Sequence, residues 1–485
     1  MVSLILGRTK LLKREVSSAE NSRERTIRAD EIAEREVSSA EKDERFDFVI
    51  KRNISSFEEA VEYIYDIPRF TKKNCMEDTK KFLRKLGSPD ERLQIIHVAG
   101  TNGKGSVCSY MKSILEAAGK KVALFTSPHL VDIRERFVIN KEMVSKEAFL
   151  EAFLAVYDCL DWDVLEMGRG YHPTYFEFLF FVGMILFERA NPDYCILETG
   201  LGGRLDATNA VENKVLSVIT RISLEHVEYL GNTITSIAGE KAGIMKAGVP
   251  VVFTDAEPEA TGVFYKKAEE LSVSAFPVSK SDYAFLNFKN KSIDFSCRSR
   301  YDEYIELHLH TIARYQMENC ALAVRAIEVL DSERQISHEM IQRGVSGCFW
   351  AGRMEEVLPG VFVDGAHNED GVRAFLETVA QSSKAGKKTL LFSVVADKDY
   401  EKMLKMIASS SLFDRILLAH LDSYRAAELS DMSRILHDIP GQCVEQYASV
   451  REAFDRVLDT KTVEEQVYIA GSLYLVGEIK EYVKR

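Results

Sequence analysis

The chain has 485 residues, of which 46% are hydrophobic and 28% charged, and its formal net charge is −12. This length is enough for two or three domains with sizeable cores, and the negative balance argues against a broad electrostatic surface for nucleic acid. The 8 cysteines are scattered and include no C-x-x-C pair, which argues against a disulfide framework or a zinc site and predicts reduced thiols in the cytoplasm. No apolar run approaches the length of a membrane span, so no membrane partner is expected.

Residues 1–45 differ in composition from the rest of the chain. Positions 8–45 contain no proline or glycine, and the heptapeptide at 14–20 (Arg-Glu-Val-Ser-Ser-Ala-Glu) recurs at 35–41. Apolar residues are too sparse for a coiled coil, whereas interleaved opposite charges favour a solvated segment. We therefore predict a charged N-terminal extension over 1–45 that is helical or disordered.

Residues 46–350 are predicted to form an α/β domain, because strands alternate with helices. The expected elements are helices 57–66 and 76–86, strand 95–99 followed by a glycine-rich turn and a helix, strand 121–126, helices 146–158 and 174–190, strands 194–198 and 215–221, a helix carrying Glu240 and Lys241, and strand 249–253. Such alternation implies a mostly parallel sheet covered on both faces. The very apolar segment 176–187 is too short to span a membrane and predicts a buried helix. Short β-like runs over 276–310 suggest a small antiparallel addition.

Residues 351–485 are predicted to form a second, smaller α/β domain of ordinary size. The expected elements are strand 361–363, helix 369–380, strand 389–395, helix 399–409, strand 415–420, helices 426–437 and 449–459, strand 466–470 and helix 472–483. Two such domains predict a cleft between them, with polar motifs at its edges.

The run Gly100-Thr-Asn-Gly-Lys-Gly-Ser106 follows the first predicted strand and opens a helix. Glycines allow a tight turn whose N–H groups point at one spot, and a helix N-terminus favours phosphate there. Lys104 would reach the outer phosphates, and Ser106 would meet phosphate or magnesium. The spacing departs from the strict P-loop by one glycine inserted after the lysine. The alternative is a tight turn with a solvated lysine.

Other polar groups follow strands, where ligands bind in α/β folds. Glu198 ends an apolar strand before a glycine-rich loop and would coordinate magnesium or polarise a water; the alternative is a solvated strand end. His226 by itself is more often a hydrogen-bonded structural residue than a ligand, and because magnesium prefers oxygen ligands a histidine ligand would be atypical. Ser127 by itself is equally ambiguous. Taken by itself, Lys241 is interpreted as an ordinary lysine on a helix. The Asp364–Asn368 cluster follows strand 361–363, and Arg353 before it could hold a phosphate.

Seven motifs in order resemble those of the folylpolyglutamate synthase family, whose members often also act as dihydrofolate synthases, within the Mur ligase superfamily. The resemblance covers roughly residues 57–485, and its motifs lie at 97–106, 126–136, 198–209, 224–231, 240–244, 352–353 and 364–368. It implies a P-loop Mur-ligase-type ATPase domain with a parallel sheet, plus a smaller Rossmann-like C-terminal glutamate-ligase domain. The implied reaction is ATP-dependent addition of L-glutamate to a folate, and also to dihydropteroate, through an acyl phosphate.

The resemblance also implies roles for individual residues. The ATP-binding positions are Gly100, Thr101, Asn102, Gly103, Lys104, Gly105, Ser106, Asn319, Arg353 and Asp364. The Mg²⁺ positions are Ser127, Glu198, His226 and Lys241, the last as a carbamate derived from CO₂. The folate positions are Thr174, Leu205, Asp206 and Ala207, and the glutamate positions are His367 and Ser472. Lys104, His226 and Lys241 are the expected catalytic groups.

The chain departs from the family pattern at two places. The usual Gly-x-His-Gln before Asn319 reads Ala313-Arg-Tyr-Gln316, so the adenine-side packing is expected to differ, and the usual proline before Gly352 is Ala351. The alternatives are another Mur-type ligase, which needs a further N-terminal nucleotide-binding domain of about a hundred residues, a P-loop switch or transport ATPase, and a nucleotide-binding protein without activity. A cytoplasmic monomer acting on small molecules is expected.

Deletion of residues 1–45 is expected to leave the steady-state kinetics of the ligase nearly unchanged. The segment holds ten basic and ten acidic residues and offers little apolar surface to bury against the remainder of the chain. Initial-rate kinetics of the truncated and full-length proteins test this expectation. A large loss of activity on truncation would mean that the extension docks near the site.

Overall fold

The computed structural model describes residues 51–67, 74–167, 170–289, 291–300, 303–381, 386–423, 425–437 and 443–484. The extension predicted over 1–45 lies outside these ranges. Among the described residues, no helix combines the length and apolar character needed to cross a bilayer.

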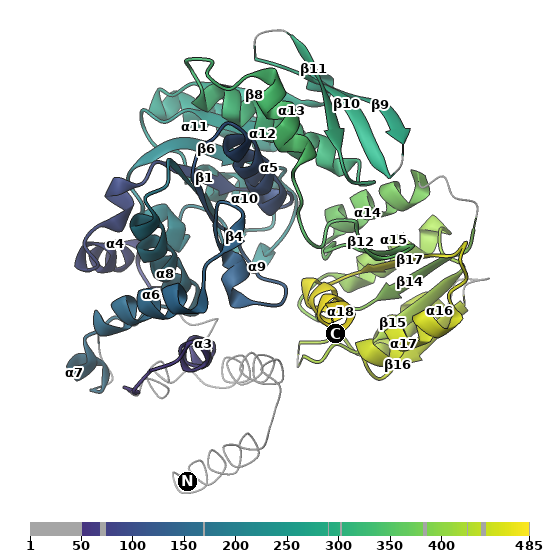
Figure 1. Cartoon of the computed structure of the whole chain (residues 1–485). Coiled ribbons are helices and arrows are strands. Elements are labelled where there is room, and N and C mark those ends of the chain that lie inside the picture. The colour runs from purple at the N-terminus through teal and green to yellow at the C-terminus, as the bar shows by residue number, and fades with distance from the viewer. Residues whose placement is uncertain are drawn as a thin grey trace, which may run out of the picture.

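The first unit is built on an eight-stranded sheet in the order β4-β3-β2-β5-β1-β6-β7-β8 (Figure 1). Its strands are β1 (Ile95–Ala99), β2 (Val122–Phe125), β3 (Phe137–Ile139), β4 (Glu142–Met143), β5 (Tyr194–Glu198), β6 (Lys214–Ile219), β7 (Val251–Asp255) and β8 (Ala275–Ser279). Strands β2, β5, β1, β6, β7 and β8 are parallel, and β3 and β4 add an antiparallel edge. Because β5, β1 and β6 are parallel neighbours, the loops after them meet at one edge of the sheet.

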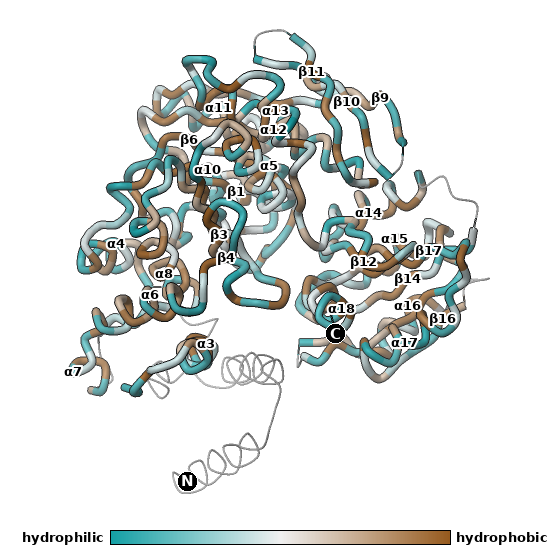
Figure 2. Tube along the Cα trace, viewed as in Figure 1, coloured by the Kyte–Doolittle hydropathy of each residue, from teal (hydrophilic) through white to brown (hydrophobic). Residues whose placement is uncertain are grey.

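Helices cover both faces of this sheet, as the alternation of strands and helices predicts. One face packs on α5 (Lys104–Ala117), α12 (Tyr315–Leu330) and α13 (His338–Ser346). The other packs on α3 (Phe57–Asp66), α4 (Met76–Lys85), α6 (Lys146–Asp158) and α8 (Tyr175–Ala190), and farther along on α10 (Ile234–Ala242) and α11 (Pro258–Leu271). Short helices α7 (Trp162–Leu165) and α9 (Val227–Leu230) complete the unit. Figure 2 shows the central strands largely in hydrophobic colours.

The prediction for 276–310 is confirmed in part. Strands β9 (Tyr283–Lys289), β10 (Ser292–Arg298) and β11 (Tyr304–Leu309) form a small antiparallel sheet, but β8 instead joins the large sheet in parallel with β7. The helix expected in the apolar segment 176–187 is α8, which is buried over almost its whole length. Helices α11, α12 and α13 were not predicted. Helix α12 is buried on most sides, so its sequence lacks the amphipathic stripe that marks a surface helix.

The second unit is a six-stranded sheet in the order β12-β13-β17-β14-β15-β16. Its strands are β12 (Glu355–Leu358), β13 (Val361–Val363), β14 (Lys388–Phe392), β15 (Arg415–Ala419), β16 (Cys443–Tyr447) and β17 (Gln466–Ala470), and all but β12 are parallel. Helices α14 (Glu369–Gln381), α15 (Tyr400–Ser410) and α16 (Leu429–His437) cover one face, and α17 (Val450–Thr460) and α18 (Leu473–Lys484) the other. This arrangement confirms the predicted Rossmann-like unit. Strand β16 was not predicted, because it lies half-exposed at the sheet edge without a clear alternating pattern.

The two sheets fall on either side of the predicted boundary at 350/351, which lies between α13 and β12 and stays a prediction as a domain limit. Polar contacts join the loops at the edge of the first sheet to the second unit, and these loops form the candidate site.

Candidate active site

The turn between β1 and α5 can be made only with glycine at two positions. Gly100 has φ +150°, and a Cβ there would lie 1.8 Å from Thr220 Oγ1. Gly103 has φ +88°, and a Cβ there would lie 2.2 Å from Asn319 Oδ1. The turn is held from the β6 side, because the N–H groups of Thr101 and Asn102 both donate to the Arg221 carbonyl. The result is a fixed backbone turn at the N-terminus of a 14-residue helix, which is a favourable place for phosphate.

Two lysines meet at this turn. Lys104 Nζ donates to the carbonyls of Gly100 at 3.0 Å and Thr101 at 3.1 Å, and Lys241 Nζ, from α10, donates to the same Gly100 oxygen at 2.7 Å. Burial, together with the neighbouring Lys104 ammonium, lowers the pKa of Lys241 to about 7. Lys241 is therefore no ordinary helix lysine: it is 4% exposed and exists largely as a mixture of amine and ammonium near neutral pH.

Glu198 lies at the end of β5, beside the turn. Its side chain is 3% exposed, so the alternative of a solvated strand end is wrong. Glu198 Oε2 accepts a hydrogen bond from the Ser127 backbone N–H at 3.2 Å. Burial raises the pKa of Glu198 to about 7, against the opposing effect of Lys104. A buried carboxylate of this kind is stabilised as the anion when a cation binds beside it.

His226 caps the N-terminus of α9 and has a left-handed backbone, with φ 50°, a state uncommon outside glycine. Burial lowers the pKa of His226 to about 4, so the ring is neutral at physiological pH, and neutral imidazole is the form that binds metals. Within the described ranges no three His, Cys, Asp or Glu side chains cluster as a metal site. Mg²⁺ in nucleotide sites takes one or two carboxylates and completes its shell with phosphates and waters, and Glu198 could supply such a carboxylate.

The predicted nucleotide residues line the other side of the turn. Gln316 Nε2 donates to Ser106 Oγ at 3.1 Å, and Asn319 Nδ2 donates to Gln316 Oε1 at 3.0 Å. A cavity of about 200 Å³ opens next to Gln316, between the two units. Its lining includes Tyr110, His310, Trp350, Arg353 and Phe362. Aromatic side chains are thus mixed with polar and charged groups such as Lys291 and Glu356, which could fix the orientation of a bound molecule.

Asp364 is held by three protein donors. It accepts hydrogen bonds from Tyr315 Oη at 2.6 Å, the Met354 N–H at 3.0 Å and the Ala366 N–H at 2.9 Å. Burial raises the pKa of Asp364, and the Arg353 guanidinium opposes that rise. Sequence reasoning noted Tyr315 only as a departure from the family pattern; the structure shows that its hydroxyl links the first unit to Asp364.

The predicted folate residues mainly organise loops. Thr174 caps α8 in a capping box with Glu177, whose carboxylate also accepts from Asn74 and Thr79. Asp206 Oδ2 accepts from the N–H groups of Gly200 and Leu201, both at 2.9 Å. Leu205 is 49% exposed and Ala207 is buried. Glu177 was missed, although the Thr-x-x-Glu spacing is the usual signature of such a cap. Folate contact by these residues stays a prediction.

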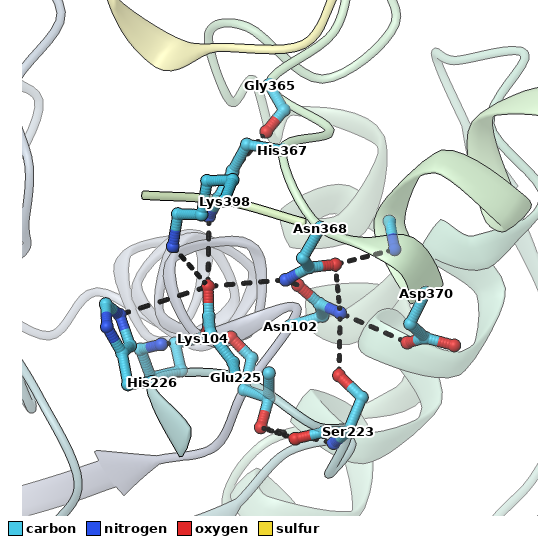
Figure 3. A network of polar contacts seen from close by, with 12 residues as sticks. Asn102, Lys104, Ser223, Glu225, His226, Gly365, His367, Asn368, Asp370 and Lys398 are labelled. Atoms are coloured by element: carbon cyan, nitrogen blue, oxygen red, sulfur yellow. Dashed lines mark hydrogen bonds and ion pairs between the residues drawn. The ribbon is translucent and has the colours of Figure 1, made fainter. Parts of the chain in front are cut away.

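The predicted glutamate residues lie in the second unit. Ser472 is 2% exposed, and its Oγ accepts from the Tyr474 N–H at 3.1 Å. His367 contacts the Gly365 carbonyl through Nδ1 at 2.7 Å and Glu225 Oε1 through Nε2 at 3.3 Å (Figure 3). Burial alone would raise the pKa of Glu225, but the hydrogen bond and charge of His367 hold it well below its usual range. Both ring nitrogens of His367 thus have protein partners, one in its own loop and one in the first unit.

The fold and this set of groups define an ATP-dependent ligase of the Mur type, and the comparisons with known proteins agree. Residues 352–473 match the family described as Mur ligase, glutamate ligase domain. A Bacillus subtilis dihydrofolate synthase/folylpolyglutamate synthase is 34% identical over 450 residues, covering 89% of this chain and 100% of the relative. The chain therefore belongs to the folylpolyglutamate synthase/dihydrofolate synthase family.

Solved structures agree with this assignment. An Escherichia coli FolC in complex with DHPP and ADP superposes with a TM-score of 0.76 at 26% identity, covering 90% of this chain and 99% of that one. An FPGS–AMPPCP–folate complex superposes with a TM-score of 0.76 at 28% identity, covering 88% and 100%.

Proposed function

We propose that this protein joins L-glutamate to a folate at the expense of ATP, and that it also joins L-glutamate to dihydropteroate. The observation that carries the proposal is the meeting of Lys104 and Lys241 at the Gly100 carbonyl, beside buried Glu198 and opposite His367 of the second unit. The phosphate-binding turn therefore faces His367, the residue proposed to bind the carboxylate of L-glutamate. Amide formation through an acyl phosphate needs a site for ATP and a site for the amino acid next to each other.

The nucleotide is proposed to lie along the turn and in the adjoining cavity. N–H groups of residues 100–106 would hold the phosphates, with Lys104 at the γ-phosphate. Gln316, Asn319, Arg353 and Asp364 would hold the nucleoside end. The cavity beside Gln316 and Arg353 and the helix N-terminus at Lys104 support this placement.

Ser127, Glu198 and His226 are the residues proposed to hold Mg²⁺, together with Lys241 as a carbamate. When bound, the ion would neutralise charge on the triphosphate. The raised pKa of Glu198 and the neutral ring of His226 support a cation there. The lowered pKa of Lys241 supports the carbamate, because the neutral amine is the form that reacts with CO₂. A bare ammonium would instead repel the cation.

The reaction then proceeds in two displacements. An oxygen of the substrate carboxylate attacks the γ-phosphorus, the bond to the β-phosphate oxygen breaks, and ADP leaves. The amine of L-glutamate attacks the acyl carbon, the carbon–oxygen bond to phosphate breaks, and inorganic phosphate leaves as the nitrogen loses a proton. Lys104 would stabilise the negative charge that develops on the γ-phosphoryl group during its transfer. His367 and Ser472 would orient the incoming glutamate.

Phosphate release measured with each substrate omitted in turn tests this proposal. ATP turnover should require L-glutamate together with either a reduced folate or dihydropteroate. Turnover without glutamate would favour a switch or transport ATPase, and turnover with a nucleotide-linked muropeptide would favour another Mur-type ligase. Activity with only one of the two pteroate substrates would limit the protein to one reaction.

We also propose that the protein is a cytoplasmic monomer. Its 8 free cysteines agree with the reducing environment of the cytoplasm.

Replacing Tyr315 by phenylalanine is expected to raise the KM for ATP about tenfold to a hundredfold, because a hydrogen bond to a buried carboxylate contributes about 1.5–3 kcal/mol and about 1.4 kcal/mol corresponds to tenfold. The hydroxyl at 2.6 Å from Asp364 joins α12 to the loop that carries Asp364. Initial rates at varied ATP measure the effect. Tyr283→Phe, which removes a hydroxyl from Glu318 at the small sheet, is the matched control and should keep the parental KM. An unchanged KM in Tyr315→Phe would show that Asp364 needs no such support.

A further inference from the structure

Glu225 in the first unit is surrounded by donors from the second. Its Oε1 lies 3.3 Å from His367 Nε2, 3.3 Å from Lys398 Nζ and 3.4 Å from Asn368 Nδ2. His367 and Asn368 lie in the loop after β13, and Lys398 lies in the loop after β14. Figure 3 shows these side chains converging on the one carboxylate. Two loops of the second unit therefore meet a single residue of the first.

The position of Glu225 couples this meeting point to the proposed cation site. Glu225 immediately precedes His226, whose Nε2 lies 4.0 Å from Glu225 Oε1, so the two side chains lie next to each other (Figure 3). The Glu225 side chain is 10% exposed and that of Lys398 is 15% exposed. A charge so far removed from water is stable only with partners, and here the Lys398 ammonium and the His367 ring both belong to the second unit.

The nucleotide side of the same interface has contacts of its own. Asn102 of the phosphate turn and Asn368 exchange two hydrogen bonds, at 3.2 and 3.0 Å, and Asn102 Nδ2 also donates to Asp370 Oδ2 at 3.1 Å. Tyr315 reaches Asp364 at 2.6 Å. Asn368 Nδ2 is shared, because it also lies 3.4 Å from Glu225 Oε1. The Asn102–Asp370 and Tyr315–Asp364 contacts involve neither Glu225 nor its partners His367 and Lys398, so the nucleotide side keeps attachments of its own.

We propose that Glu225 is a positioning residue for the second half of the reaction, holding His367 and the Lys398 loop against the turn that carries His226 so that the incoming amino acid meets the activated acid. This inference rests on the proposed ligase function. The carboxylate acts through the residues it holds and touches none of the reacting atoms. Its loss should therefore affect capture of L-glutamate more than formation of the acyl phosphate.

The test separates the two halves in the full-length protein. Reversible acyl phosphate formation is followed without glutamate, as folate-dependent scrambling of oxygen-18 between the bridging and non-bridging positions of the β-phosphate of ATP. In Glu225→Gln this exchange should stay within about twofold of the parent, while the KM for L-glutamate rises and kcat falls, each by about tenfold or more, as expected when a buried charge pair loses one partner. Glu225→Asp, which keeps the charge, should recover part of the loss.

Asp397→Asn is the matched control. Asp397 neighbours Lys398, but its ion pair, with Arg425 at 2.6 Å, lies within the second unit. This variant should keep the parental kinetics. An unchanged KM for L-glutamate in Glu225→Gln, an equal loss of isotope exchange and glutamate capture, or the same defect in Asp397→Asn would each overturn the proposal. A parent protein without glutamate-dependent turnover would instead contradict the proposed function, so the two failures are distinguishable.

Discussion

Lys104→Ala is expected to abolish ligation while the protein stays folded. The side chain is only half-buried and makes its hydrogen bonds to two carbonyls of its own turn, so its loss removes little from the core. Its proposed role is electrostatic, because the ammonium stabilises the negative charge that develops on the γ-phosphate in the transition state. Removing one such donor lowers the rate by about 10²- to 10³-fold. Turnover should fall at least that far.

Glutamate-dependent ADP formation measures this effect, and circular dichroism with thermal unfolding reports the fold. Lys267→Ala is the matched control, since Lys267 forms an exposed pair with Glu270 on α11, within one helix. Normal turnover by a folded Lys104→Ala protein would refute the assignment of residues 100–106 as the phosphate-binding turn.

Lys241→Ala is expected to be nearly inactive, and a small carboxylate is expected to restore part of its activity. Two unit positive charges about 4 Å apart repel by roughly 4 kcal/mol at an effective dielectric near 20, so an unmodified ammonium beside Mg²⁺ is unfavourable. A carbamate reverses that charge and supplies the oxygen that Mg²⁺ prefers. Acetate or formate would occupy the oxygen position left by the truncation, and Lys241→Glu would keep a trace of activity because its carboxylate is shorter but correctly charged.

Activity should also depend on dissolved CO₂ and on pH in a defined direction. Because burial lowers the pKa of Lys241 to about 7, the reactive amine dominates above that pH and is lost as pH falls through it. Carbamate formation is therefore favoured on the alkaline side. Native mass measurement reports the modification independently of turnover, as the added mass of one CO₂ that is absent from Lys241→Ala. Lys246→Ala, which alters a lysine just beyond α10, is the control. A bare Lys241 in an active, magnesium-loaded protein would contradict the carbamate.

The sequence alone was most informative where function restricts the backbone. Gly100 and Gly103 mark the turn because only glycine fits against Thr220 and Asn319, and the apolar run before Glu198 marks a strand leading to a buried carboxylate. The two α/β units follow from the alternation of their elements. The buried helix α12 and the edge strand β16 escaped prediction because neither shows a clean hydrophobic period.

Long-range polar partners could not be predicted in the same way. Glu225 meets residues 142 to 173 positions later, and Tyr315 meets Asp364 across two units, so no local pattern signals either contact. The family resemblance implies that Asp206 contacts folate, which stays a prediction, and the structure adds that Asp206 shapes the loop after β5. Motif spacing in the sequence therefore indicates which residues carry functional groups, whereas their contact partners become known only from the folded structure.

Transfer of an oxygen atom from substrate to phosphate tests the proposed ligase chemistry most directly. A folate labelled with oxygen-18 in its γ-carboxylate is incubated with the protein, ATP and L-glutamate, and the released phosphate is analysed by mass spectrometry. Attack of the carboxylate on the γ-phosphorus followed by displacement at the acyl carbon predicts one labelled oxygen in each phosphate formed with the amide. Unlabelled phosphate released alongside the glutamylated product would contradict an acyl phosphate intermediate, and phosphate released without any amide would contradict ligation itself.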